Sequence, residues 1–135
     1  MNKLIVLLLA LTSCSTLTVV STLSDKNLND LLGKKITVEG TAVNAKLGAL
    51  LITKDSSSIW INGIDSWPTG YYLGGDNGKT LKVTGTLIEK YDLPVFIYKE
   101  GELPKSGIPV PVGTDLKEAS RRYLLKGAKW EIISE

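Results

Sequence analysis

The sequence of 135 residues contains no histidine and a single cysteine, Cys14. Histidine is the side chain that most often acts as a general base or a metal ligand near neutral pH, and a lone cysteine cannot form a disulfide within the chain. Sixteen Lys and Arg against fourteen Asp and Glu leave a net charge of only +2, which is too balanced for the footprint of a nucleic-acid-binding protein. These absences argue against metal chemistry, histidine-based catalysis and polyanion binding.

The chain also has no hydrophobic run long enough to cross a membrane as a helix, because its longest run extends only from Leu4 to Leu11. A spanning helix needs about 20 apolar residues, whereas the hydrophobic region of a secretion signal has about 7–15. Lys3 supplies a positive charge before the run, and small residues close it. Residues 1–13 are therefore predicted to be a signal peptide.

The sequence Leu11-Thr12-Ser13-Cys14 resembles the lipobox of bacterial lipoproteins. In that family the cysteine thiol receives a diacylglyceryl group, the chain is cut just before it, and the new α-amino group is acylated. The resemblance implies that Cys14 is the lipidated first residue of the mature protein, held at a membrane by several acyl chains. Ser15 stands where an aspartate would resemble the inner-membrane retention signal, so an outer-membrane location facing the periplasm is implied for a Gram-negative source. The alternative is an ordinary signal peptide with a cysteine nearby.

The rest of the chain is long enough for one domain with its own core. Residues 14–24 are rich in Ser and Thr and lack periodicity, which predicts a tether, and residues 25–135 are expected to form the domain. Ser24 is expected to cap a short helix that Gly33 ends. The apolar face of this helix consists of Leu28, Leu31 and Leu32.

An internal repeat at an offset of 45 residues is the most informative feature of the domain. Residues 33–42 and 78–87 share a pattern in which apolar and polar residues alternate, which predicts a half-buried strand in each copy. Gly40 and Gly85 fall on the inward side, where they indicate a sharp bend or the close approach of another backbone. Further strands are predicted at 49–53, 58–61 and 95–98, and a last one after Arg122.

Together these patterns predict an all-β fold, a small OB-like Greek-key barrel of five to six strands with a short N-terminal helix. The resemblance is to small periplasmic and lipoprotein OB-fold domains and spans Leu31–Ile133. We expect a loop or a short helix, capped by Thr114 or Asp115, before the last strand, which pairs an edge that would otherwise stay open. Residues 63–78 contain five glycines, which predicts a loop where an OB fold often has a helix. A barrel of six to eight strands or a sandwich is the alternative.

Aromatic residues supply the candidate binding surface. The two isoleucines beside Trp60 take the inward positions of the strand predicted at 58–61, so Trp60 is expected to point outward. In OB folds the ligand face combines the second and third strands with the 1–2 and 4–5 loops, here about 44–48 and 89–94. The candidate partner-binding residues are Trp60, Trp67, Tyr71, Tyr72, Tyr91 and Lys46. Alternatively, the long loop packs its own rings onto the barrel.

The most basic stretch, residues 117–129, is expected to be a solvated face or a contact for anionic lipids or an acidic partner. Glu39 and Asp65 could serve a hydrolase of envelope polysaccharide, but nothing in the sequence pairs them. We therefore expect no catalytic residue, no cofactor and no metal.

These observations predict a lipid-anchored, non-catalytic protein of the cell envelope that binds a protein partner, as an immunity protein, an inhibitor or a scaffold. A module that binds a glycan or a small ligand through its aromatic residues is the alternative. A hydrolase and a nucleic-acid binder have less support, the latter because export separates the chain from nucleic acid.

Overall fold

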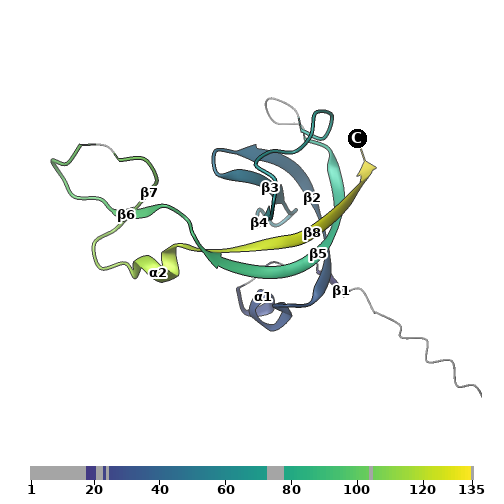
Figure 1. The fold of residues 1–135 in the computed structure, drawn as a ribbon, viewed down its shortest axis with the longest axis horizontal. Coiled ribbons are helices and arrows are strands. Elements are labelled where there is room, and N and C mark those ends of the chain that lie inside the picture. Colours follow the sequence, from purple (N-terminus) through teal and green to yellow (C-terminus); the bar gives the residue numbers. More distant parts are fainter. Residues whose placement is uncertain (1–17, 21–22, 24, 73–77, 104, 135) are drawn as a thin grey trace, which may run out of the picture.

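The computed structural model describes residues 18–20, 23, 25–72, 78–103 and 105–134. In these ranges it contains a six-stranded sheet, a separate two-stranded sheet and two short helices, which confirms the expected all-β class (Figure 1). The elements are β1 (Thr18–Val20), α1 (Asp25–Leu31), β2 (Lys35–Ala45), β3 (Gly48–Ile52), β4 (Ser58–Ile61), β5 (Thr80–Tyr91), β6 (Val95–Ile97), β7 (Ile108–Val110), α2 (Leu116–Ala119) and β8 (Arg121–Ser134).

Five strands of the large sheet are paired in a closed circuit. β2 pairs with β3, β3 with β4, β4 with β8, β8 with β5, and β5 again with β2. The pair β4–β8 is parallel and the other four pairs are antiparallel. β1 is the sixth strand and pairs parallel with β2. In Figure 1, β5 and β8 form a long curved ribbon below β2, β3 and β4.

The two glycines of the repeat lie where another backbone comes close, as the sequence predicts. The first half of β2 pairs with β5 and its second half with β3, and Gly40 directly precedes Thr41, which pairs with both. A Cβ atom on Gly40 would lie 2.5 Å from the carbonyl oxygen of Ile52. A Cβ atom on Gly85 would lie 3.0 Å from the carbonyl oxygen of Lys126, beside a bulge in β8 where Gly127 has φ +62°.

The core consists mainly of the inward residues of the five strands and of one ring from the loop after β4, and Val20, Leu23 and Leu28 from the N-terminal part also belong to it. The inward apolar residues of the repeat are all buried: Ile36, Val38, Ala42, Leu81, Val83 and Leu87. One outward position differs from the expectation, because Thr37 is 1% exposed. Its hydroxyl is hydrogen-bonded to that of Thr84 at 2.9 Å, and this contact satisfies a polar group that would otherwise be costly to bury.

The predicted helix is α1, which lies at the lower end of the sheet in Figure 1. Leu28 is buried, and the chain leaves the helix through Gly33, whose φ of +80° suits glycine. Ser24 and its expected cap lie outside the described residues. Part of the segment predicted to be a tether packs on the domain, because β1 pairs with β2 and Leu23 is buried.

The chain between β5 and β8, residues 92–120, projects from one side of the sheet (Figure 1). It carries the parallel pair of β6 and β7 and then α2, which Asp115 caps, so the expected helix or loop before the last strand is a short helix. β5 continues to Tyr91, and the turn expected at 89–94 is therefore wrong in its first three residues. In residues 62–72 and 78–79 the chain after β4 contains no helix, as its glycines predict.

Candidate binding site

Trp60 lies on the outer face of β4. The neighbouring Ile59 and Ile61 are buried in the core, and the alternation of the strand turns Trp60 to the other side, where it is half-buried. Its ring occupies the space above Gly48, where a Cβ atom would lie 3.5 Å from the ring carbon Cε3. Glycine suits this position because its φ is +142°, and the indole lies within van der Waals reach of it.

Arg122 covers Trp60 from the start of β8. Its guanidinium carbon lies 5.0 Å from the centroid of the Trp60 ring, a cation–π distance. The Nε and Nη2 groups of Arg122 donate to the two carboxylate oxygens of Asp92 at 2.6 and 2.8 Å. This hydrogen-bonded pair holds the pKa of Asp92 below its usual value. Because the pairing is bidentate, it fixes the plane of the guanidinium over the indole.

A pocket of about 210 Å³ opens beside this stack. It is bounded by Leu47 from the β2–β3 turn, Asn62 and Asp65 after β4, Lys90 at the end of β5, and Arg122. Lys90 stands directly opposite Arg122 in the β5–β8 register, and its Nζ donates to Oδ1 of Asn62 at 2.8 Å. The pocket therefore combines an exposed leucine, two cations and a carboxylate at the end of β4.

The other rings of the predicted set lie in a different place. Trp67 is 1% exposed, and its indole N–H donates to the carbonyl oxygen of Leu50 at 2.7 Å. Its ring meets Trp130 edge-to-face at 5.0 Å, and Tyr71 meets the same tryptophan at 6.1 Å. Tyr72 is half-buried and packs against the core. These rings gather on the inner side of the sheet around Trp130. Their placement agrees with the alternative interpretation, in which the long loop packs its own rings onto the domain.

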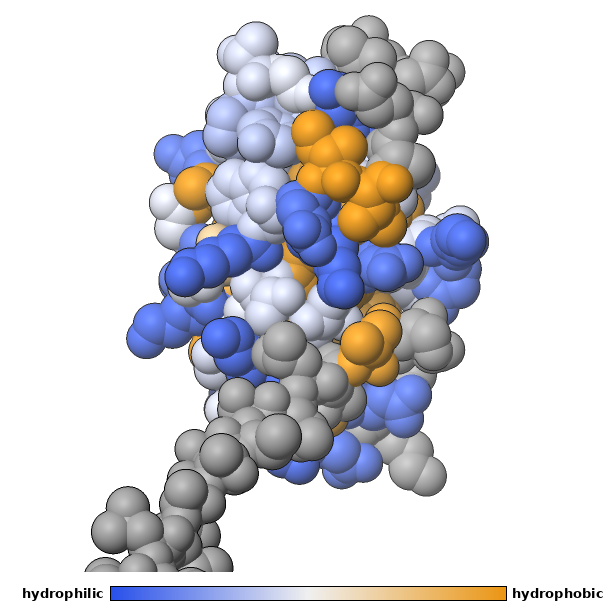
Figure 2. All heavy atoms as spheres, turned by 90° about the vertical axis from the view of Figure 1, so that its right-hand side faces the viewer, coloured by the Kyte–Doolittle hydropathy of each residue, from blue (hydrophilic) through white to orange (hydrophobic). Residues whose placement is uncertain are grey.

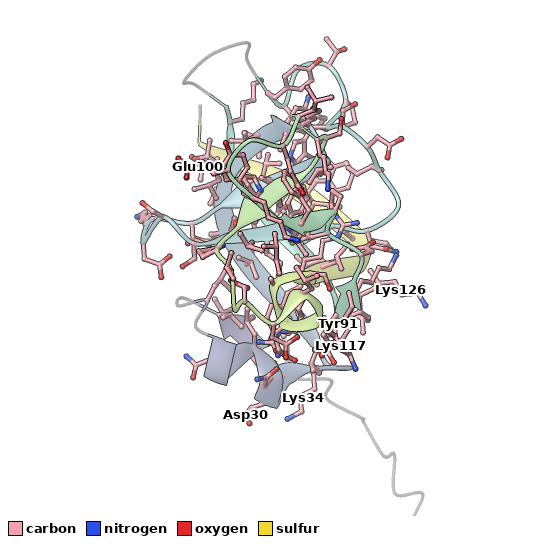
Figure 3. All side chains as sticks on the ribbon, turned by 90° about the vertical axis from the view of Figure 1, so that its left-hand side faces the viewer. Asp30, Lys34, Tyr91, Glu100, Lys117 and Lys126 are labelled. Carbon is pink, nitrogen blue, oxygen red and sulfur yellow. The ribbon has the colours of Figure 1, made fainter. Side chains whose placement is uncertain are left out.

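The remaining predicted residues lie near the pocket without lining it. Lys46 is exposed in the β2–β3 turn, next to Leu47. Tyr91 is exposed at the end of β5, and Lys117 Nζ lies 5.3 Å from the centroid of its ring (Figure 3). Cys14, the predicted lipidation site, lies outside the described residues. The structure thus places Trp60 beside the pocket, Lys46 and Tyr91 near it, and the other three candidate rings on the inner side of the sheet.

The sequence carries no local signal for most of the partners of Trp60. Arg122 belongs to the basic stretch that the sequence singles out, but Asp92, Lys90 and Asn62 have no local pattern that marks them. They meet because β4 pairs with β8, which brings Trp60 opposite Leu124, two residues after Arg122. Knowledge of this parallel pair is needed to find them.

The described residues contain no group of three or more His, Cys, Asp or Glu side chains placed to hold a metal ion. Two carboxyl groups in this part of the chain have a clearly shifted pKa. The hydrogen bond from Thr53 lowers the pKa of Asp55, and that from Arg122 lowers the pKa of Asp92. Both hydrogen bonds favour the ionised form of the carboxyl group that accepts them.

No family model, no curated protein and no solved structure matches this chain. Within the described residues, no helix has the length and apolar character needed to cross a membrane.

Proposed function

We propose that the protein is a lipid-anchored, non-catalytic binding protein of the cell envelope, which engages a protein partner through the surface formed by Trp60, Arg122 and the adjoining pocket. The observation that carries this proposal is the stack of Arg122 on an outward tryptophan. Trp and Arg are the residue types most enriched among those that dominate the binding energy of protein interfaces. An immunity, inhibitor or scaffolding role fits such a surface.

The fold that we propose for the domain is an OB-like Greek-key barrel. The closed circuit of five strands in the order β2-β3-β4-β8-β5, with its single parallel pair β4–β8, supports this assignment. In such a barrel β3 and β4 are the second and third strands, which form the ligand face together with the 1–2 and 4–5 loops. Trp60, Leu47 and Asp92 belong to these parts, so the site coincides with the usual ligand face.

The size of the pocket favours a protein over a small ligand. Pockets for drug-sized ligands have about 300–1,000 Å³, whereas this one has about 210 Å³. A side chain of a partner fits such a volume. Asp92 already holds the Arg122 side chain, which is 17% exposed, so little side-chain entropy is lost when a partner covers it.

The anchor is proposed from the resemblance of residues 11–14 to a lipobox. Replacing the lipidated residue, Cys14→Ser, is expected to leave an uncleaved or soluble species, which fractionation and mass spectrometry of the full chain will detect. Normal membrane retention and lipid mass in this variant would contradict the anchor without affecting the proposed binding surface.

The binding surface is tested by photo-crosslinking of the full, natively processed chain in cells. A photoreactive residue at Leu47, beside the pocket, is expected to trap one protein in stoichiometric amount, and Trp60→Ala is expected to abolish the adduct. Tyr98→Ala is the matched control, because Tyr98 is an exposed aromatic residue on the projecting segment 92–120 and is 53% exposed. The adduct should persist in this control.

An adduct that Trp60→Ala leaves unchanged, while the variant keeps the wild-type circular dichroism, would overturn the assignment of the surface. If no protein is trapped, titration with envelope saccharides tests the glycan alternative. A saturable shift in tryptophan fluorescence that is absent in Trp60→Ala would then favour the glycan and contradict the protein partner.

A further inference from the structure

The strand β8 has an edge that is only partly paired. One edge pairs with β5 along nearly the whole strand, but the other edge pairs with β4 only at Leu124 and Leu125, followed by one bond from the Asn62 N–H to the carbonyl of Leu125. From Lys126 to Ser134 no strand of the described chain occupies this second edge. An open edge is a template for pairing with another strand.

Most of this edge is exposed. Lys129 and Glu131 are exposed on the outer side of the sheet, and Ile132 and Ile133 are 41% and 43% exposed. The side of the molecule on which β8 ends shows separate hydrophobic patches among hydrophilic residues (Figure 2). Charge pairing rather than a continuous apolar surface is therefore expected to choose the partner strand.

One row of outer side chains across the sheet alternates in charge, and it ends at this edge. Glu39 of β2 lies opposite Lys82 of β5, which lies opposite Glu131 of β8. In the next row, Thr37 lies opposite Thr84, which lies opposite Lys129. The open edge thus presents a lysine and a glutamate two residues apart on the same face. Opposite charges directly across strands stabilise a pair, and like charges destabilise it.

We propose that two copies of this chain pair through these edges as an antiparallel, two-fold symmetric dimer centred on Trp130. In this register Lys129 of each copy stands opposite Glu131 of the second copy, so both charged rows are extended by an opposite charge. On the inner side Ala128 stands opposite Ile132 of the second copy, which adds an apolar contact. A single two-fold axis satisfies both copies, as an isologous interface requires.

The self-complementary order of charges selects a second copy over an unrelated strand. An antiparallel copy of the same edge reverses the order of Lys129 and Glu131 and so matches both charges at once, whereas another strand must supply that pattern independently. The dimer leaves the Trp60–Arg122 surface uncovered, because β4 meets β8 at Leu124, at the other end of the strand. The dimer and the proposed partner-binding function can therefore be tested independently of each other.

The register is tested by disulfide crosslinking of the full chain in cell membranes. The variant carrying both Lys129→Cys and Glu131→Cys is expected to give a dimer on a non-reducing gel, because Cα atoms opposite each other in an antiparallel pair are about 4.5–5.5 Å apart, within the range that a disulfide spans. Each single variant places its cysteine diagonally, about 7–8 Å from its own copy, and should crosslink much less. The wild type, with Cys14 alone, gives the background.

Charge exchange tests the same register without cysteines, by light scattering of the purified full chain. Lys129→Glu is expected to raise the dimer dissociation constant about tenfold, since it converts both cross-strand pairs into repulsions. Adding Glu131→Lys should restore dimerisation, although it places a lysine beside Lys82 within the chain. Lys105→Glu, on the projecting segment, is the control and should have no effect.

A double cysteine variant that folds normally but stays monomeric would overturn the proposal. So would trapping of another protein at this edge without the homodimer, or a charge exchange that fails to restore the dimer that Lys129→Glu disrupts.

Discussion

The closed circuit of strands and the projecting segment 92–120 are built by different forces. The largest fully buried side chains, each with almost none of its surface exposed, all belong to the circuit and its covering loop, whereas no described residue of 92–120 is buried. Leu103 and Val112 in that segment are 86% and 78% exposed. The circuit is held by apolar burial, and the segment is held by local hydrogen bonds such as the cap of Asp115. Most of the free energy of unfolding is therefore expected to come from the sheet, and the segment 92–120 is expected to tolerate substitutions.

The same substitution in the two regions measures this difference. Leu51→Ala removes a side chain that is 0% exposed and should lower the free energy of unfolding by about 2–5 kcal/mol, because it leaves a cavity in the core. Leu103→Ala removes an exposed side chain and should change it by less than about 0.5 kcal/mol. Urea denaturation followed by circular dichroism measures both values.

Equal losses in the two variants would contradict the division, since they would place Leu103 in a contact as important as the core. A loss larger than about 2 kcal/mol at Leu103 alone would show that the projecting segment is docked on something in solution. In that case the sheet and the segment would have to be treated as one cooperative unit.

The sequence predicts the individual strands of the circuit well because alternation is a local signal. The inward positions of the repeat, the hairpin between β3 and β4, and the role of Gly40 all follow from residues close together in the chain. Burial of Thr37 could not be predicted, because its hydroxyl partner belongs to β5, 47 residues away. The strand β1 could not be predicted either. It lies in the segment expected to be a tether, whose many Ser and Thr residues show no alternation, and it forms by pairing with β2.

The candidate site is less predictable from the sequence because its members come from four separate segments. The outward direction of Trp60 follows from alternation, but Arg122 and Asp92 reach it only through the β4–β8 pairing and the turn after β5. Trp67 could not be separated from Trp60 by composition alone. Its burial depends on the hydrogen bonds to Leu50 and Asn44, which draw the loop after β4 across the core.

The pair of Arg122 and Asp92 joins the two regions. The pH dependence of the free energy of unfolding measures how much this pair contributes to stability. The pKa of Asp92 is lower in the folded protein, mainly through the hydrogen bond from Arg122, so this carboxylate stabilises the fold above its unfolded pKa of about 3.9. The contribution is lost as the pH falls through the folded pKa. Because Asp92 is 43% exposed, we expect less than about 1 kcal/mol at pH 7.

Asp92→Asn should therefore be slightly less stable than the wild type at pH 7, and the gap should close as the pH is lowered below about 4. Urea denaturation at a series of pH values measures the difference. A gap that grows on acidification would mean that the carboxyl group is more stable in its protonated form in the folded state, the opposite of the pairing with Arg122. Asp65→Asn, at the pocket but outside this pair, is the matched control.

The smallest effect on stability is expected at α2, where loss of the helix cap should change only the helix itself. Oδ1 of Asp115 accepts hydrogen bonds from the backbone N–H groups of Lys117 and Glu118 at 3.0 and 3.3 Å. Asp115→Ala removes this cap, which is typically worth about 1 kcal/mol to a helix. The two amides should then exchange with solvent roughly fivefold faster, measured by hydrogen exchange, while the amide of Leu125 in β8 keeps its rate.

Because α2 contributes no buried side chain, its opening exposes no core, and the global free energy of unfolding should change by less than about 0.5 kcal/mol. Faster exchange at Leu125 in Asp115→Ala would mean that opening of α2 spreads into the sheet. The segment 92–120 would then transmit strain to Arg122, and whatever disturbs the projecting segment would also move the guanidinium that covers Trp60.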